Sequence, residues 1–383
     1  MHIVVAPDSF KGSLSAKQVG DIIGNALMLE LPHASISVFP MADGGEGTVD
    51  SFLHATGGKR VTLRATGPDG RTVTTYYGAL ESPRLAVIEI AAVAGLSLVP
   101  VERRNPMLLG TYGVGECILH ALDSGFSHLI IGLGGSATND GGIGMLQALG
   151  AKFYDRGGTP LPPIARSLAK VHAVDFSALD PRVKSSRIVV ASDVTNVLCG
   201  LNGASYVYGP QKGATPEQIE ELDKAMEIYA SRVEAHLGRS LRNEPGAGAA
   251  GGLGFALLAV GAVIESGADI LARVTGLDAS LRKAHWVVTG EGKTDSQTLQ
   301  GKLPYNVAMR AKQFGVPTIL ISGSLDGDLE PLYDVFESMH AIANGPISLE
   351  QSVADAESLI RHKARNIARL LRHRKSGKNS DTG

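Results

Sequence analysis

The sequence has few cysteines, few aromatic residues and almost no net charge, and each shortage excludes a class of protein. Two cysteines in 383 residues, Cys117 and Cys199, are too few for a disulfide framework or a cysteine-type zinc site. This usage favours a reducing, cytoplasmic compartment. The 36 Lys and Arg residues against 38 Asp and Glu residues leave a net charge of −2, which excludes a globally basic nucleic-acid coat. Aromatic residues form only 5% of the chain.

Long hydrophobic runs are also scarce, and only residues 246–264 approach the length of a membrane span. These 19 residues carry no charge, but five glycines lie among the first nine positions, and Glu265 and Asp269 follow directly. The run therefore predicts a glycine-rich loop that opens a buried helix rather than a membrane span. Residues 1–8 lack the basic segment of a signal peptide and predict a first strand. We expect no membrane partner.

Glycine, in contrast, is abundant and unevenly distributed. The chain has 47 glycines in 383 residues, about 12% against ~7% in ordinary proteins. The glycines show no three-residue period, which excludes a collagen-like chain. Twenty of them lie in five short windows, at 43–47, 132–144, 200–213, 246–254 and 290–292. The excess is therefore concentrated in a few loops.

Apolar runs of strand length alternate with amphipathic helices, which predicts a mostly parallel sheet with covered faces. Two helix starts are marked by capping boxes, Ser15 with Gln18 and Thr215 with Gln218. Residues 61–100 differ, because short strands separated by Gly/Pro turns predict a meander there. The meander marks the start of a different domain.

We therefore predict a two-domain α/β fold. A discontinuous Rossmann-like domain with a parallel sheet is built from both termini, residues 1–60 and 286–372. A second α/β domain, residues 61–285, is inserted between these segments. The polar tail, residues 373–383, is expected to be disordered.

One pattern recurs at the ends of predicted strands, where a loop carries glycines together with an acid or an amide. It occurs at residues 8–12, 43–47, 132–144 and 290–295, and residues 193–196 form a fifth such loop that carries an acid and an amide without glycine. The string Asp-Gly-Gly-x-Gly appears twice. Glycine lets backbone N–H groups approach an anion such as phosphate. The acids would repel phosphate unless a divalent cation lies between them. Each loop alone fits a tight turn, but five together indicate a Mg-nucleotide site.

Two stretches of the sequence resemble other nucleotide-binding motifs. The string Gly292-Lys293-Thr294 ends like a P-loop, but Val287 occupies the position of the required glycine. The residues Gly132, Gly134 and Ala137 fit a permissive dinucleotide fingerprint, with Asp155 as the ribose acid. A nicotinamide-dinucleotide-binding oxidoreductase that uses this loop is therefore the alternative function.

Six strings resemble the bacterial glycerate kinase family, in the class I type seen in glyoxylate, glucarate and galactarate breakdown. They occur in order over about residues 1–370: APDSFKG at 6–12, MADGGEGT at 41–48, GLGGSATNDGG at 132–142, GPQKGA at 209–214, PGAGAAGGLG at 245–254 and TGEGKTD at 289–295. Six ordered strings are far more specific than any single glycine loop.

The resemblance implies ATP- and Mg²⁺-dependent phosphorylation of D-glycerate. It implies 2-phosphoglycerate as the product, with 3-phosphoglycerate less favoured. It also implies two α/β domains with the active site in the cleft between them. The expected partners are thus glycerate and ATP, without nucleic acid, and the expected assembly is a monomer or a homodimer.

The strings mark positions without assigning roles, which we infer from the needs of phosphoryl transfer. A substrate hydroxyl must lose a proton, usually to an aspartate. Asp193 closes a buried strand and is the predicted base, whereas Asp43 is the competing candidate. Both are also candidate Mg²⁺ ligands. Lys11 would neutralise a phosphate or the glycerate carboxylate.

The remaining predicted site residues divide between nucleotide and substrate. The nucleotide phosphates would be held by two loops and a lysine: Gly134, Gly135, Ser136, Thr138, Asn139 and Asp140, then Gly248, Gly251 and Gly252, and finally Lys293. The substrate-binding residues would be Ser9, Lys11, Glu291 and Asp295.

Overall fold

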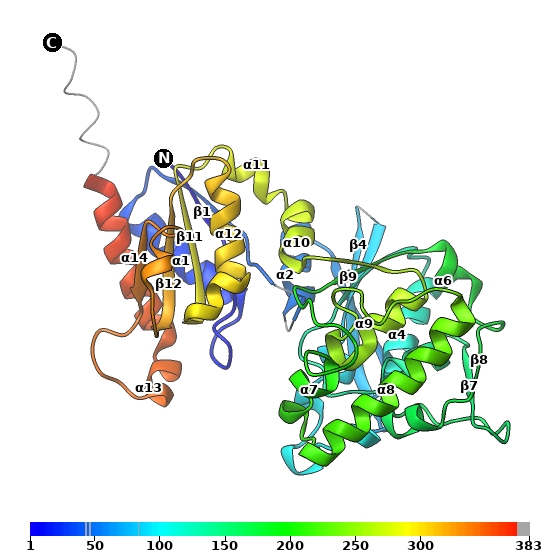
Figure 1. Ribbon diagram of the computed structural model, residues 1–383. Helices are drawn as coiled ribbons and strands as arrows, with labels where there is room; N and C mark the ends of the chain where they lie inside the picture. Colours follow the sequence, from blue (N-terminus) through cyan, green and yellow to red (C-terminus); the bar gives the residue numbers. More distant parts are fainter. Residues whose placement is uncertain (43, 46, 83, 374–383) are drawn as a thin grey trace. The chain divides into compact units, whose positions relative to one another are not determined.

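The structure is a computed structural model that describes residues 1–42, 44, 45, 47–82 and 84–373. The chain forms two compact units of mixed α/β type (Figure 1). The first unit comprises the described residues within 1–42, 50–56 and 268–383, and the second those within 43–49 and 57–267.

These units divide the chain at different residues from the predicted domains. The described residues of 44–49 group with the second unit, and residues 268–285 group with the first. The domain limits drawn from the sequence, 1–60 with 286–372 and 61–285, therefore stay predictions. The predicted disordered tail lies, beyond residue 373, outside the described residues.

The first unit is built on a five-stranded sheet in which every neighbouring pair is parallel. The strand order is β13-β12-β11-β1-β2, with β1 at His2–Val5, β2 at Ser35–Val38, β11 at Trp286–Thr294, β12 at Thr318–Leu325 and β13 at Ser338–Ala341. The order reverses between β1 and β11, as in doubly wound folds of the flavodoxin type. The predicted parallel sheet is confirmed.

Helices cover both faces of this sheet (Figure 1). Helices α1 and α14 pack with Ile319 and Ile321 on one face, whereas Ala308 of α12 packs with Leu320 on the other. The capping box of Ser15 and Gln18 is present at the start of α1. The helices are α1 Ala16–Glu30, α2 Thr48–Thr56, α10 Gly267–Thr275, α11 Leu277–Leu281, α12 Leu303–Lys312, α13 Leu349–Ala354 and α14 Ala356–His373.

Strands β11 and β12 run further than the sequence predicts. Residues 290–294 were expected in a loop, but they continue β11 and pair with β12 as far as Thr294 and Leu325. Glycine explains the extension, because a Cβ on Gly290 would lie 2.5 Å from the Ile321 oxygen, and one on Gly323 2.2 Å from the Gly292 oxygen. The two strands approach too closely for side chains at these positions.

The second unit contains a six-stranded mixed sheet in the order β10-β9-β6-β5-β4-β3. The predicted meander is confirmed as β3, β4 and β5, which pair antiparallel, whereas β5, β6, β9 and β10 pair parallel. The strands are β3 Lys59–Thr66, β4 Thr72–Glu81, β5 Arg84–Glu89, β6 His128–Gly132, β9 Arg187–Ala191 and β10 Val263–Glu265, and a separate hairpin joins β7 Lys152–Tyr154 to β8 Ala173–Asp175.

Helices α4, α5, α8 and α9 pack in one apolar core with this sheet. The capping box at Thr215 and Gln218 starts α8, and Gly238 ends it in the left-handed conformation. Residues 249–257, from the long uncharged run, are buried in α9, as predicted. No helix in the described part of the chain is long and apolar enough to cross a membrane. The helices are α3 Ala91–Ala94, α4 Tyr112–Asp123, α5 Ile143–Ala148, α6 Pro181–Ser185, α7 Ala204–Tyr208, α8 Pro216–Leu237 and α9 Ala249–Ala259.

Candidate active site

The carboxyl ends of four parallel strands meet at one edge of the second unit's sheet. Glu89, Gly132, Ala191 and Glu265 are the last residues of β5, β6, β9 and β10, and they lie in register with one another. The loops that follow these strands therefore begin side by side. In α/β sheets this is the edge at which ligands bind.

The first Asp-Gly-Gly-x-Gly loop docks on this edge. The Gly44 carbonyl accepts a 2.9 Å hydrogen bond from the Gly134 N–H. A Cβ on Gly44 would lie 2.2 Å from the Ala191 oxygen, and a Cβ on Gly134 would lie 2.3 Å from Gly45 Cα. Glycine is thus required at both positions because two backbones touch. Asp43, the competing candidate base, lies outside the described residues.

Glu89 holds this docked loop, a role that the sequence analysis missed. The side chain is only 2% exposed, and its carboxylate accepts hydrogen bonds from the N–H groups of Gly47 at 3.1 Å and Val49 at 3.2 Å. These donors lie at the start of α2, where backbone N–H groups have no partner within the helix. An acid at the end of a buried strand was the available signal, and it is the same signal that selected Asp193.

Asp140 organises the loop that follows β6. Its side chain is fully buried, and the carboxylate accepts hydrogen bonds from the N–H and hydroxyl of Thr111 and from the N–H groups of Gly142 and Gly144. Burial raises the pKa of Asp140, and these donors oppose the shift. Both carboxylate oxygens are thus engaged within the protein, so Asp140 shapes the loop.

The neighbouring predicted residues divide by accessibility. Thr138 and Asn139 are fully buried, and Asn139 donates a 2.9 Å hydrogen bond to the Ser205 hydroxyl. Gly134 is partly accessible and Gly135 is exposed. Nucleotide binding by this loop stays a prediction, and Gly134 and Gly135 are its accessible part.

The second predicted phosphate loop packs backbone to backbone against the first. Ala250, Gly251 and Gly252 adopt left-handed conformations in succession. A Cβ on Gly251 would lie 2.1 Å from the Thr138 oxygen, and the Gly251 oxygen accepts a hydrogen bond from the Gly141 N–H. Gly248, Gly251 and Gly252 are buried. Close packing alone requires glycine here, so phosphate binding by these residues stays a prediction.

Asp193 lies two residues beyond the end of β9, at the same sheet edge. Its side chain is exposed. The preceding residue, Ser192, donates its N–H to the Glu265 carbonyl at 3.1 Å, which ties this segment to β10. Gly44 of the docked loop lies against the backbone of Ala191, two residues before Asp193. The role of Asp193 as base or metal ligand stays a prediction.

The first unit holds a second group of predicted residues at its topological switch point. The Asp8 N–H donates to the Gly290 carbonyl at 2.8 Å, and a Cβ on Gly292 would lie 3.4 Å from the backbone nitrogen of Lys11. The loop after β1 thus runs along the end of β11. Ser9 and Lys11 are brought to the part of the chain that carries Glu291.

Glu291 and Asp295 form a charged network that includes a lysine the sequence analysis missed. Glu291 is 5% exposed and accepts hydrogen bonds from the hydroxyls of Thr294 and Thr298, and burial raises its pKa. The Lys302 ammonium lies 3.0 Å from Asp295 and 3.7 Å from Glu291. Its position beside the start of α12 was the only available signal.

Lys293 lies at the exposed margin of the same network. Its ammonium is 2.9 Å from the Asp326 carboxylate and 3.8 Å from Asp295. The Asp326 carboxylate raises the pKa of Lys293, so the side chain stays cationic. A cation of this kind suits an anionic ligand, but its predicted contact with nucleotide stays a prediction.

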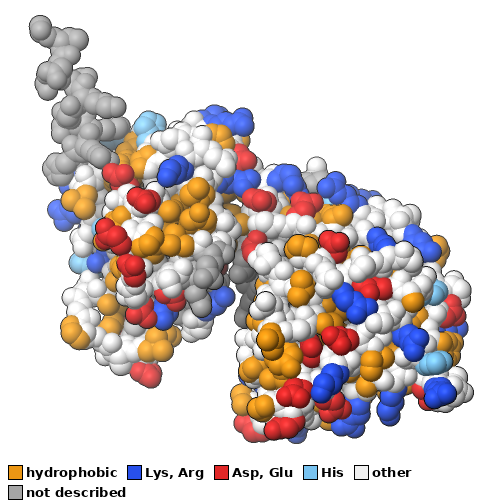
Figure 2. Space-filling model, in the orientation of Figure 1, with side chains coloured by type: hydrophobic (Ala, Val, Ile, Leu, Met, Phe, Trp, Pro, Cys, Tyr) orange, Lys and Arg blue, Asp and Glu red, His pale blue; other side chains and the backbone are white. Residues whose placement is uncertain are grey.

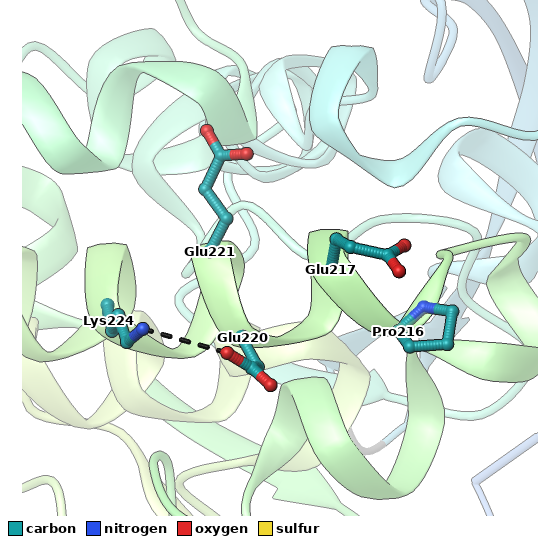
Figure 3. A pocket seen from close by; sticks show the side chains of 5 residues that line it. All are labelled: Pro216, Glu217, Glu220, Glu221 and Lys224. Atoms are coloured by element: carbon teal, nitrogen blue, oxygen red, sulfur yellow. Dashed lines mark ion pairs between the residues drawn. The ribbon is translucent and has the colours of Figure 1, made fainter.

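A hollow elsewhere on the second unit lacks the predicted site residues. A hollow of about 340 Å³ lies along α8 and is lined by Pro216, Glu217, Glu220, Glu221 and Lys224, all from one helix (Figure 3). It contains none of the predicted site residues. Acidic and basic side chains are interspersed on the face shown in Figure 2.

The dinucleotide alternative is not supported. The fingerprint requires a helix that begins inside the motif, but α5 begins only at Ile143, well after Ala137. Asp155, the predicted ribose acid, instead accepts hydrogen bonds from the N–H groups of Gly157 and Thr159 in its own turn. Packing against Gly45 is by itself enough to require glycine at position 134, without a dinucleotide.

Glycine-rich loops at the carboxyl ends of parallel strands are typical of α/β enzymes that bind anionic ligands. Comparison with known sequences makes the class specific, because the sequence profile of the glycerate kinase family matches residues 3–372. The chain belongs to the glycerate kinase family.

Individual relatives align with this chain along nearly their whole length. The chain is 43% identical over 374 residues to a glycerate kinase of Bacillus subtilis, which covers 97% of this chain and 98% of the relative. It is 43% identical over 373 residues to the glycerate 2-kinase of Escherichia coli, with coverage of 97% and 98%. A crystal structure of a Salmonella typhimurium LT2 protein assigned as glycerate kinase 2 matches with a TM-score of 0.87, 44% identity and coverage of 98% and 99%.

Proposed function

We propose that the chain is a glycerate kinase that transfers the γ-phosphoryl group of ATP to D-glycerate and forms 2-phosphoglycerate. Family membership over residues 3–372 supports the kinase activity, and the name of the Escherichia coli relative supports the 2-phosphoglycerate product. The observation that carries the proposal is the sheet edge at Glu89, Gly132 and Ala191, where several glycine-rich loops converge.

The nucleotide is assigned to the loop after β6. Gly135 is exposed and has a φ of 75°, so backbone there can approach a phosphate without a side chain in the way. The acceptor is assigned to the first unit, where Lys11 is exposed and would bind the glycerate carboxylate. Ser9, Glu291 and Asp295 would orient its hydroxyl groups. A site between the two units, a cytoplasmic location and a monomeric or dimeric assembly stay predictions.

Magnesium fits this arrangement as a partner of the nucleotide. Within the described residues, no group of three or more His, Cys, Asp or Glu side chains could hold a metal. Mg²⁺ in kinases is usually held by one or two carboxylates together with substrate phosphates, so no such group is needed. Asp43 would supply a carboxylate, with Asp193, the proposed base, as the alternative ligand. The ion would neutralise charge on the phosphates.

In the proposed reaction, the glycerate hydroxyl oxygen attacks the γ-phosphorus and the bond to the β-phosphate oxygen breaks, which releases ADP. The hydroxyl proton passes to a carboxylate oxygen of Asp193. Catalysis of this kind depends mainly on positioning and charge neutralisation. The rigid sheet edge and the buried Asp140 would supply the positioning, and Lys11 would neutralise the substrate carboxylate.

The test is an assay of ADP release with D-glycerate and Mg-ATP, together with enolase coupling in the absence of a mutase. Only 2-phosphoglycerate feeds enolase directly, so coupling identifies the product. Asp193→Asn should lower kcat by about 10²–10⁴-fold with little change in ATP affinity, because it removes a proton acceptor. Glu221→Gln, an exposed change on α8, is the matched control. Near-normal kcat in Asp193→Asn would remove it as the base, and no ADP release from the unaltered enzyme would reject the kinase.

A further inference from the structure

Lys212 is a buried lysine that has no carboxylate partner among the described residues. It ends the short 3-10 helix Pro210–Lys212 and is only 2% exposed. Its ammonium donates hydrogen bonds to the Ser136 hydroxyl at 2.9 Å and to the Thr138 carbonyl at 2.7 Å. Among the described residues, no carboxylate lies within ion-pair distance of it. Both acceptors belong to the loop after β6.

Such a lysine is costly to bury. An ammonium in an apolar interior is destabilised unless charge and hydrogen bonds compensate it. Burial lowers the pKa of Lys212 to about 7, and only the charge of Asp140 opposes the shift. An ammonium has three donors, and the two hydrogen bonds to Ser136 and Thr138 use two of them. The protonated side chain of Lys212 therefore keeps one N–H donor, and its positive charge is not neutralised by an ion pair within the described residues.

We propose that Lys212 is a positioning residue of the nucleotide loop, which it fixes at Ser136 and Thr138, and the source of positive charge that this loop offers to a phosphate. The inference rests on the proposed function, because it takes the loop after β6 as the phosphate-binding loop. Lys212 acts through the loop and not by direct contact, since its side chain is almost fully buried. An arriving phosphate supplies the missing negative charge, so binding draws a proton onto Lys212.

The groups around Lys212 leave it as the titrating group. Asp140 is the charged group that acts on its pKa. On the packed helix α7, Tyr208 donates a hydrogen bond to the Asn196 side chain, and burial raises its pKa. Tyr206 is the second tyrosine of α7, so Tyr206 and Tyr208 are the titratable side chains of that helix. Arg104, whose carbonyl lies beside Gly213, donates to the carbonyls of Leu96 and Val99.

Calorimetry of Mg-ADP binding in two buffers with different ionisation enthalpies measures the predicted proton uptake. At pH 7.5 the unaltered protein should take up roughly half a proton per ADP, and its affinity should fall as pH rises from 7 to 9. Lys212→Met should bind more weakly, by about tenfold, without this uptake. Lys212→Arg, which is always charged, should also lack the uptake and keep its affinity at pH 9. Proton exchange of the nucleotide itself is common to all three proteins and cancels in the difference.

Lys224→Met, an exposed lysine on α8, is the control and should behave like the unaltered protein. If Lys212→Met does not fold, the comparison with Lys212→Arg decides alone. Equal proton uptake in the unaltered protein and in either folded Lys212 variant would overturn the inference while leaving nucleotide binding intact. No binding of Mg-ADP to the unaltered protein would instead reject the proposed function, and the inference with it.

Discussion

Two alanine substitutions in one loop test whether the docking of residues 44–49 matters for catalysis. Gly44 and Gly47 have similar positive φ values, 92° and 88°. Alanine in this left-handed region costs about 1–2 kcal/mol at either position. They differ in one respect, because a Cβ on Gly44 would lie 2.2 Å from the Ala191 oxygen, whereas a Cβ on Gly47 would meet nothing within 4 Å.

The size of the expected effect follows from the overlap. A tolerable contact lies at 3.0–3.4 Å, so in Gly44→Ala the loop must move by about 1 Å from the sheet edge. A misplacement of about 1 Å in an active site can lower the rate by ~10²-fold. Gly47→Ala has only the free-energy cost of alanine in the left-handed conformation and no steric overlap, so its kcat should stay within about threefold of the unaltered enzyme.

The assay is kcat for ADP release, with thermal unfolding of each variant as the control for folding. Both variants should unfold at temperatures lowered by a similar amount, about 2–4 °C, because the shared φ cost dominates stability. The reasoning is refuted if both variants have the same kcat, or if Gly44→Ala is as active as the unaltered enzyme. A loss of folding in Gly44→Ala alone would show instead that docking stabilises the whole unit.

Two further predictions concern buried charges. Glu89→Ala should lower the free energy of unfolding, measured in urea, by about 2–4 kcal/mol, because it leaves the N–H groups of Gly47 and Val49 unpaired. Glu89→Gln keeps an acceptor oxygen and should lose less stability. Equal losses in the two variants would contradict the role of Glu89 in holding the docked loop. Folded Lys212 has a pKa of about 7 against the usual 10.5, so between these values the unfolded chain binds more protons. Stability relative to Lys212→Met should therefore rise from pH 7 to 9, by about 1 kcal/mol per pH unit, in paired melts; parallel pH profiles would refute it.

Local features of the fold could be predicted because their causes lie within a few residues. The capping boxes at Ser15 and Thr215 are present at the expected helix starts. The strands around the meander are also where alternating and apolar runs placed them. The partner of a capping residue lies three positions away, and the buried face of a strand repeats every two residues, so both depend on close neighbours in the sequence.

Longer-range features could not be predicted in the same way. The extension of β11 through Thr294 depends on its pairing with β12, and glycines in that segment suggest a loop when read alone. Asp140 is an acid of a motif expected beside a nucleotide, but its carboxylate oxygens accept hydrogen bonds from Thr111 and from N–H groups of its own loop. Which acid faces outward is decided by packing against distant segments.

The α/β class, the glycine-rich strand ends and the family could all be read from the sequence, because they depend on local pattern and on ordered strings. The reason for individual glycines became clear only from the folded chain, where Gly44, Gly134 and Gly251 lie at contacts between two backbones. The same holds for the contacts of Glu89 and Lys212, whose partners are far away in the chain. Burial and register come from the packing of the whole chain, and no short pattern encodes them.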